Sequence, residues 1–149
     1  EAIFGHFRVF DDVPPALERL RAAGVAVHVL SNSDGAYQRA KLAAVGLGDL
    51  ATDGFFSGEL GVAKPDPRIF TLAADRLGRA PAEVAYVGDR WEVDVLGSAA
   101  AGMTAVWLNR TGAARPGGHR TGPAAQIVTL DELGVGADGL RFGGEARAR

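Results

Sequence analysis

Two carboxylates and one lysine stand out in this sequence because each lies just beyond a short apolar segment or in a polar loop. Gly88-Asp89 ends the apolar stretch 84–87, and Asp94 follows Asp89 five residues later. Lys64, one of two lysines in the chain, directly precedes a proline. Mg²⁺ prefers oxygen ligands and usually takes one or two carboxylates together with phosphate oxygens and water. Asp89 and Asp94 are therefore candidate metal ligands.

Hydrogen-bond donors follow an earlier apolar stretch, where Ser31-Asn32 comes directly after residues 25–30. The Ser31 hydroxyl and the Asn32 backbone N–H could donate to phosphoryl oxygens. The Lys64 ammonium would offset negative charge on a phosphoryl group and on nearby acids. Asp94 could orient Lys64 or a metal-bound water. Together these residues suit the transfer of an anionic group.

Each of these residues also has an ordinary structural interpretation. Ser31 alone would more often cap a helix or close a turn, and Lys64 alone would be a solvated loop lysine. Asp89 alone would be a turn acid, and Asp94 would face solvent on a helix. A shared site becomes the better hypothesis only because the polar groups occur together, in order, and each at the end of an apolar segment.

The elements that must position these residues alternate along the chain. The pattern predicts strands at 25–30, 55–56, 84–87, 104–108 and 126–128, and helices from 13 to 23 and at 36–45, 68–77 and 91–101. Residues 1–10 have helix-like apolar spacing. Strands that alternate with helices predict an α/β fold with a mostly parallel sheet. Because parallel strands end at one edge of a sheet, the polar groups would meet there.

Composition narrows the possible functions. The chain has 149 residues, 47% of them hydrophobic and 23% charged, which fits one ordinary globular domain. Its formal net charge of −2 gives no reason to expect a nucleic acid or a membrane as partner. It contains no cysteine, which excludes disulfides and thiolate chemistry, and we expect a cytoplasmic location.

Three ordered motifs resemble the haloacid dehalogenase-like (HAD) hydrolase superfamily, in its subgroup with a helical cap. They are Val29-Leu30-Ser31-Asn32, Ala63-Lys64-Pro65-Asp66-Pro67-Arg68-Ile69-Phe70 and Val87-Gly88-Asp89-Arg90-Trp91-Glu92-Val93-Asp94. The resemblance runs from about Asp11 to Arg110. It implies a three-layer Rossmann-like core and Mg²⁺-dependent hydrolysis of a small phosphate monoester through an aspartyl-phosphate.

The resemblance also implies a role for each motif residue. Ser31 and Asn32 would hold the phosphoryl group, Lys64 would neutralise its charge, and Asp89 would bind Mg²⁺ with support from Asp94. Family members that remove halogen from haloacids need no metal. The acidic Gly88-Asp89 motif therefore favours a phosphatase over a dehalogenase.

The family's first motif, a strand ending in Asp-x-Asp that supplies the nucleophile, is not evident in this sequence. We therefore expect a fragment, with 1–10 the end of a helical cap or a linker, 11–133 the core, and 134–149 a flexible tail. The absent strand is central in the family. The sheet should then contain a gap or pair its neighbours directly, and another chain or a missing N-terminal segment could complete it.

Three alternatives remain open from the sequence. The segment Ile127-Val128-Thr129-Leu130-Asp131 could deliver Asp131 as the nucleophile of a circular permutant, although Glu132-Leu133 follows where a second Asp should stand. The chain could be a catalytically inactive module that binds phosphate and Mg²⁺ or another protein. It could also come from a haloacid dehalogenase-type hydrolase.

Overall fold

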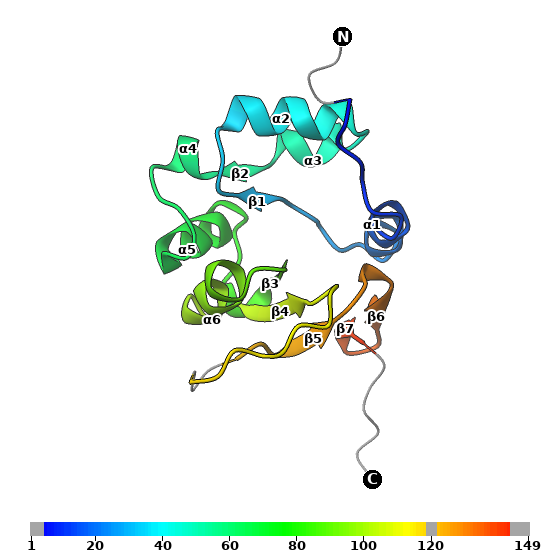
Figure 1. Ribbon diagram of the computed structural model, residues 1–149, viewed down its shortest axis with the longest axis vertical. Coiled ribbons are helices and arrows are strands. Elements are labelled where there is room, and N and C mark those ends of the chain that lie inside the picture. The colour runs from blue at the N-terminus through cyan, green and yellow to red at the C-terminus, as the bar shows by residue number, and fades with distance from the viewer. Residues whose placement is uncertain (1–4, 119–121, 144–149) are drawn as a thin grey trace.

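Helices surround parallel strands in the computed structural model, which describes residues 5–118 and 122–143 (Figure 1). The α-helices are α1 (Val13–Ala22), α2 (Gly35–Ala44), α3 (Gly48–Thr52), α4 (Ser57–Leu60), α5 (Pro67–Arg76) and α6 (Gly97–Ala100). The other helical turns are η1 (Pro81–Glu83), η2 (Trp91–Leu96) and η3 (Leu130–Glu132), and η2 is a wide π-type turn that leads into α6. The strands are β1 (Leu30–Ser31), β2 (Phe55–Phe56), β3 (Ala85–Gly88), β4 (Thr104–Leu108), β5 (Ala125–Ile127), β6 (Leu133–Gly136) and β7 (Gly139–Phe142). The α/β class with parallel strands is confirmed.

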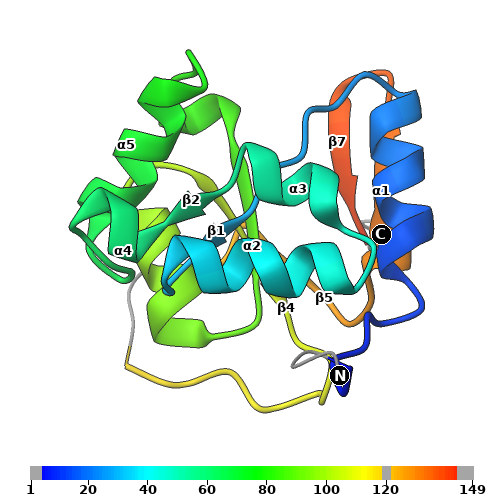
Figure 2. The same cartoon turned by 90° about the horizontal axis from the view of Figure 1, so that it is seen from above.

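The strand β4 shows how the core is layered. Successive side chains of a strand point to opposite faces of its sheet. Val106 accordingly packs with Leu20 of α1, whereas Ala105 and Trp107 pack against Trp91 on the opposite side. Helices therefore cover both faces of this sheet, as Figure 2 shows from a second direction.

The helix α5 begins where the sequence predicts. Pro67 occupies its first turn, where a missing N–H costs nothing, and the Asp66 carboxylate accepts from the Arg68 backbone N–H at 2.9 Å. Its buried face carries Ile69 and Phe70, which are both fully enclosed. This packing fixes the loop that bears Lys64 against the side of β3.

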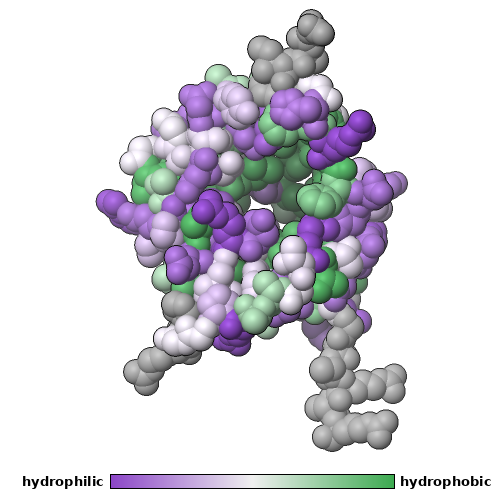
Figure 3. Space-filling model, in the orientation of Figure 1, coloured by the Kyte–Doolittle hydropathy of each residue, from purple (hydrophilic) through white to green (hydrophobic). Residues whose placement is uncertain are grey.

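The parallel strands fall into two separate groups. β1 pairs with β2, and β3, β4 and β5 form a second sheet in that order, so in the described part of the chain β1 and β3 are not hydrogen-bonded to each other. The strand predicted at 25–30 is correspondingly short, because only Leu30–Ser31 has a strand partner. Of the two arrangements expected, the structure has the gap. Figure 3 shows hydrophobic residues around a hollow near the middle of this face.

The predicted flexible tail was wrong for residues 134–143. They form most of an antiparallel hairpin in which β6 pairs with β7. Leu133 is 7% exposed within the cluster that also contains Leu20, Val106 and Ile127, and Phe142 packs on the same cluster. Burial of these two apolar side chains holds a glycine-rich segment that sequence alone classed as loose. The core thus extends past residue 133, and 144–149 lie outside the described residues.

Residues 5–10, expected to be the end of a helical cap or a linker, form a turn and then irregular chain in spite of their helix-like apolar spacing; residues 1–4 lie outside the described part. Phe10 is 63% exposed and its ring stacks with the Arg110 guanidinium, 4.1 Å from Cζ to the ring centre. The Phe7 ring lies 4.0 Å from the Lys41 ammonium. These aromatic side chains contact cations on separate elements, so they do not form one apolar helical face.

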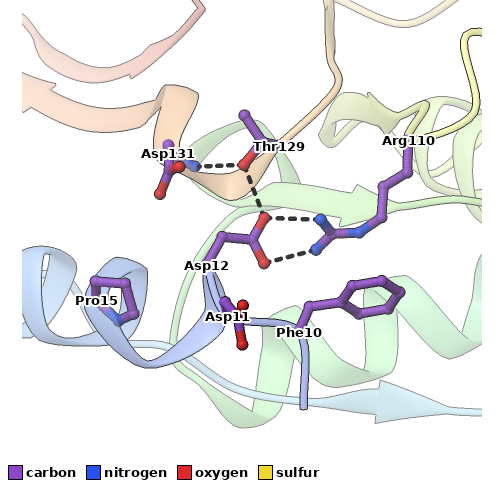
Figure 4. Close-up of a pocket in the computed structure, with 7 residues that line it drawn as sticks. All are labelled: Phe10, Asp11, Asp12, Pro15, Arg110, Thr129 and Asp131. Carbon is purple, nitrogen blue, oxygen red and sulfur yellow. Dashed lines mark hydrogen bonds and ion pairs between the residues drawn. The ribbon is translucent and has the colours of Figure 1, made fainter. Parts of the chain in front are cut away.

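Asp12 fastens the start of α1 to the far end of the chain (Figure 4). Its carboxylate accepts from both Arg110 Nη atoms at 2.7 and 3.0 Å, from the Thr129 hydroxyl at 2.8 Å and from the Leu130 N–H at 2.8 Å. The hydrogen bonds from Arg110 hold the pKa of Asp12 well below its usual range, against the opposing effect of burial. Asp12 stands at the N-cap position of α1, yet its side chain does not cap the helix and acts instead as a structural clamp between distant segments. Within the described residues, no helix has both the length and the apolar character needed to cross a membrane.

Candidate active site

The loop after β1 and the loop between α4 and α5 are joined by two hydrogen bonds of the Asn32 side-chain amide. The Asn32 side-chain N–H donates to the Lys64 backbone carbonyl at 2.8 Å, and the Lys64 backbone N–H donates to the Asn32 side-chain oxygen at 2.8 Å. The Lys64–Pro65 peptide bond is cis. The Asn32 amide therefore fixes the backbone from which the Lys64 side chain extends. The sequence had placed Asn32 only as a backbone donor to phosphate.

The Lys64 side chain ends in a buried ion pair. Its Nζ lies 2.6 Å from Asp94 Oδ1, and the two side chains are only 11% and 6% exposed. The ammonium also donates to the Tyr86 hydroxyl at 2.9 Å. The suggestion that Asp94 could orient Lys64 thus corresponds to a direct contact. Lys64 lies in the loop before α5 and Asp94 lies in η2, so their pairing brings the Lys64 motif and the Asp89 motif together.

Asp94 reaches this position because of η2 and a glycine. The Arg90 backbone N–H donates to Asp94 Oδ2 at 3.0 Å across the wide first turn of η2. The Asp94 side chain lies so close to Gly88 that a Cβ on that residue would overlap it. Only glycine at the end of β3 allows the carboxylate to sit beside the strand. The close approach of the Asp94 side chain therefore explains why the residue before Asp89 is a glycine.

Asp89 lies at the tip of β3 and is exposed. Its backbone carbonyl accepts from the Trp107 indole N–H at 3.0 Å, which fixes the backbone, while no described residue hydrogen-bonds to its carboxylate. Both oxygens of Asp94, in contrast, already accept from nitrogen donors. Asp89 is therefore the better placed of the two predicted metal ligands.

The described residues contain no cluster of three or more His, Cys, Asp or Glu side chains arranged to hold a metal ion. Mg²⁺ does not need such a cluster, because substrate phosphate and water commonly complete its coordination. The residues present fit Mg²⁺ in that the Asp89 carboxylate is available as one ligand, with further oxygen ligands supplied from outside the described residues.

Ser31 ends β1 next to the Asn32 amide, and its hydroxyl forms no hydrogen bond within the described part.

Tyr86 is the site residue that the sequence interpretation missed. Its hydroxyl lies 3.3 Å from the Leu30 carbonyl and 3.4 Å from Asp94 Oδ1, in addition to the contact with Lys64. Burial, assisted by the negative charge of Asp94, raises the pKa of Tyr86 far above its usual range, so the hydroxyl stays protonated. The available signal was a tyrosine within an otherwise apolar strand, since a buried tyrosine hydroxyl usually has a partner.

Asp131, the candidate nucleophile of a permuted chain, lies elsewhere. It lines an open pocket of about 480 Å³ together with Phe10, Asp11, Asp12, Pro15, Arg110 and Thr129 (Figure 4). Its backbone N–H donates to the Thr129 hydroxyl at 3.3 Å, and its side chain is exposed in η3, after β5 has ended at Ile127. The residues around this pocket do not include Ser31, Lys64 or Asp89, so the structure gives the permutation hypothesis no support.

Comparison with known families agrees with this geometry. The model of the haloacid dehalogenase-like hydrolases matches residues 1–102, which include all three motifs. The chain belongs to this family. Its relatives include HAD-like phosphatases and HAD-like haloacid dehalogenases.

A phosphoserine phosphatase of Thermus thermophilus is 38% identical over 136 residues, which cover 89% of this chain and 54% of the relative. An (S)-2-haloacid dehalogenase of Burkholderia cepacia is 35% identical over 126 residues, or 83% of this chain and 53% of the relative. The crystal structure of a HAD phosphatase from Thermococcus onnurineus superposes with a TM-score of 0.72 at 38% identity, covering 83% of this chain and 55% of that one. The HAD chain thus spans about half the length of the curated relatives it matches.

Proposed function

We propose that this chain supplies the phosphate-binding and metal-binding part of a Mg²⁺-dependent phosphatase that acts on small phosphate monoesters. The buried Lys64–Asp94 pair is the observation that carries the proposal, because it places a fixed cation beside the tips of β1 and β3. A positive charge held in a poorly solvated site stabilises a phosphoryl anion more strongly than one in water. The phosphatases among the relatives add support.

Each residue has a separate task in this proposal. The Ser31 hydroxyl and the Asn32 backbone N–H donate to phosphoryl oxygens, and the Lys64 ammonium offsets their charge. The Asp89 carboxylate would hold Mg²⁺, which when bound would lower the electrostatic cost of bringing a carboxylate nucleophile to the phosphorus. Asp94 keeps the Lys64 ammonium in place.

An aspartate outside these residues acts as the nucleophile. Its carboxylate attacks phosphorus, and the ester oxygen departs as an alcohol with a proton from a general acid that also lies outside these residues. Water then hydrolyses the aspartyl-phosphate, which releases phosphate and restores the carboxylate. This aspartate comes on a strand that pairs in the gap between β1 and β3, contributed by a preceding segment of the whole protein or by another chain. The open pairing positions on both strands support this arrangement.

Two other functions are weighed against the phosphatase. The haloacid dehalogenase relative favours halide removal from a 2-haloacid by an aspartate nucleophile, a reaction that would not use Asp89. An inactive module would bind phosphate and Mg²⁺ without turnover, which the absence of an evident nucleophile in the sequence favours.

One set of assays separates these functions. The whole protein is supplied with a generic phosphate monoester or a 2-haloacid, each with Mg²⁺ and with a chelator. We expect phosphate release that requires Mg²⁺ and is abolished by Asp89→Asn, whereas Asp131→Asn leaves the rate unchanged. Halide release that persists in chelator would replace the proposal by dehalogenation. Phosphate binding without any turnover would favour the inactive module.

A further inference from the structure

Tyr86 crosses the gap between the two groups of strands. It belongs to β3, yet its hydroxyl contacts the Leu30 carbonyl of β1 at 3.3 Å. No backbone hydrogen bond joins β1 to β3 in the described part of the chain. The Tyr86 hydroxyl therefore forms a hydrogen-bonded link between the strand that ends in Ser31 and the strand that leads to Asp89.

The direction of each hydrogen bond follows from the donors available. A protonated lysine can only donate, so the Tyr86 hydroxyl accepts from Lys64 Nζ at 2.9 Å. The hydroxyl has one proton of its own, which it donates either to the Leu30 carbonyl or to Asp94 Oδ1. The Tyr86 hydroxyl thus contacts both the Leu30 carbonyl and the Lys64 ammonium, and it fixes the position of the ammonium relative to β1.

The ammonium is left with one donor for a ligand. Of its three N–H groups, one binds Asp94 Oδ1 and one binds the Tyr86 hydroxyl, and no other described group accepts from Lys64 Nζ. Two fixed acceptors determine the direction of the third N–H. Without the hydroxyl, Asp94 alone would hold the ammonium, and the remaining N–H groups could rotate about that one contact.

The tyrosine ring is itself well fixed. It meets Phe70 edge to face, with ring centres 4.9 Å apart and an angle of 88° between the planes. Phe70 is fully buried in α5, the helix that follows the Lys64 loop. An aromatic ring with few rotatable bonds, packed in this way, holds its hydroxyl with little freedom.

We propose that Tyr86 is a positioning residue that directs the free N–H of Lys64 toward the phosphoryl group and sets the spacing between Lys64 and Ser31. This inference rests on the phosphatase function proposed above. Tyr86 acts through Lys64 and does not touch the substrate. Its contribution should therefore disappear when Lys64 is absent, which a purely structural contribution would not do.

A double-mutant cycle in the whole protein tests this dependence. Tyr86→Phe removes the hydroxyl and keeps the ring, and Tyr37→Phe removes a hydroxyl from a half-exposed tyrosine of α2 as a matched control. With a generic phosphate monoester and Mg²⁺, we expect Tyr86→Phe to lower kcat at least tenfold while KM changes less than threefold. In a Lys64→Gln background, the same substitution should change the residual kcat less than twofold. Equal effects in both backgrounds, or an unchanged kcat in the first, would overturn the proposal.

A spectroscopic measurement on the unsubstituted protein does not depend on the variants folding. Solvent-exposed lysine ammonium groups exchange protons with water too fast to be seen by NMR near neutral pH. With ¹⁵N-labelled lysine, we expect a protected Lys64 ammonium signal, assigned by its loss in Lys64→Gln, with a through-space cross-peak to the Tyr86 ring. Absence of that signal or of the cross-peak would contradict the geometry on which the proposal stands.

The two experiments distinguish failure of the positioning role of Tyr86 from failure of the proposed phosphatase function. If the unsubstituted protein shows no turnover, the proposed phosphatase fails, and the ammonium signal still decides whether Tyr86 positions Lys64. If turnover is normal but insensitive to Tyr86→Phe, the positioning role alone fails.

Discussion

At the residue scale, the charged side chains of the site differ widely in their exposure to solvent. The Lys64–Asp94 pair is almost fully buried, whereas the Asp89 carboxylate on the same edge is exposed. Removal of one partner of a buried pair leaves an uncompensated charge, which costs far more than loss of an exposed one. The two acids of one motif should therefore respond differently to the same substitution.

Asp94→Asn should lower the free energy of unfolding by about 3–5 kcal/mol, because the Lys64 ammonium would remain buried without a charge partner. Asp89→Asn is the matched control, and its effect should stay within about 0.5 kcal/mol, as for most exposed substitutions. Urea denaturation of the two variants measures both values. A loss of stability that is equal for both would show that the Lys64–Asp94 pair is not buried as described.

The interactions of Asp12 predict how the free energy of unfolding depends on pH. Its pKa is lowered in the folded state by Arg110, so its contribution to stability is complete above the ordinary carboxyl pKa of about 4. That contribution is lost as pH falls from there toward the lower folded-state pKa.

The difference in unfolding free energy between the unsubstituted chain and Asp12→Asn should therefore be constant from pH 8 to 5 and shrink below about pH 4. Asp11→Asn, at the neighbouring exposed acid, serves as the control for general effects of acid. A difference that grows on acidification would have the wrong sign for this clamp.

At the element scale, the sequence predicted the elements whose local signals agree with their packing. β4 was predicted with its observed bounds, because its apolar side chains pack on both faces and a glycine precedes them. β1 is shorter than predicted, since strand length depends on a neighbour that the sequence of the strand does not reveal. The β6–β7 hairpin was missed because Gly134, Gly136 and Gly139 lower strand propensity.

The hairpin contributes Leu133 to the buried core cluster, and Phe142 packs against the same cluster. Leu133 is 7% exposed, whereas Leu140 on the paired strand is 38% exposed. Leu133→Ala should cost about 2–4 kcal/mol of unfolding free energy, and Leu140→Ala less than about 1 kcal/mol. Thermal or urea denaturation of the pair measures this contrast. Equal, small losses would mean that the hairpin is not packed on the core and that residues from 134 onward form the loose tail predicted from sequence.

The site was predictable in its residue types and less so in its contacts. Ordered motifs pointed to Ser31, Lys64, Asp89 and Asp94 as candidate site residues. The convergence of parallel strand ends favoured a site in which Lys64 lies close to Asp94, and the two are in contact. The roles of the Asn32 amide and of Tyr86 could not be read from the sequence. They depend on how the loops approach each other across the gap, which no local pattern encodes.

At the scale of the whole molecule, the gap between β1 and β3 dominates the expected behaviour. Both strands present unpaired backbone groups toward it, and such edges favour association with other strands. The isolated chain should show a broad thermal transition and a sedimentation profile that depends on protein concentration. A sharp cooperative transition of a monomer at all concentrations would indicate that the gap needs no additional strand.

The central claim is that the fixed Lys64 ammonium forms part of a phosphate-binding site. The two lysines of the chain offer a direct comparison, because Lys41 lies on α2 with its ammonium over the Phe7 ring. Calorimetric titration of the whole protein with inorganic phosphate in the presence of Mg²⁺ measures binding without requiring turnover. We predict that Lys64→Gln weakens phosphate binding at least tenfold, whereas Lys41→Gln changes it less than twofold. Equal affinity in the two variants would contradict this account of the site.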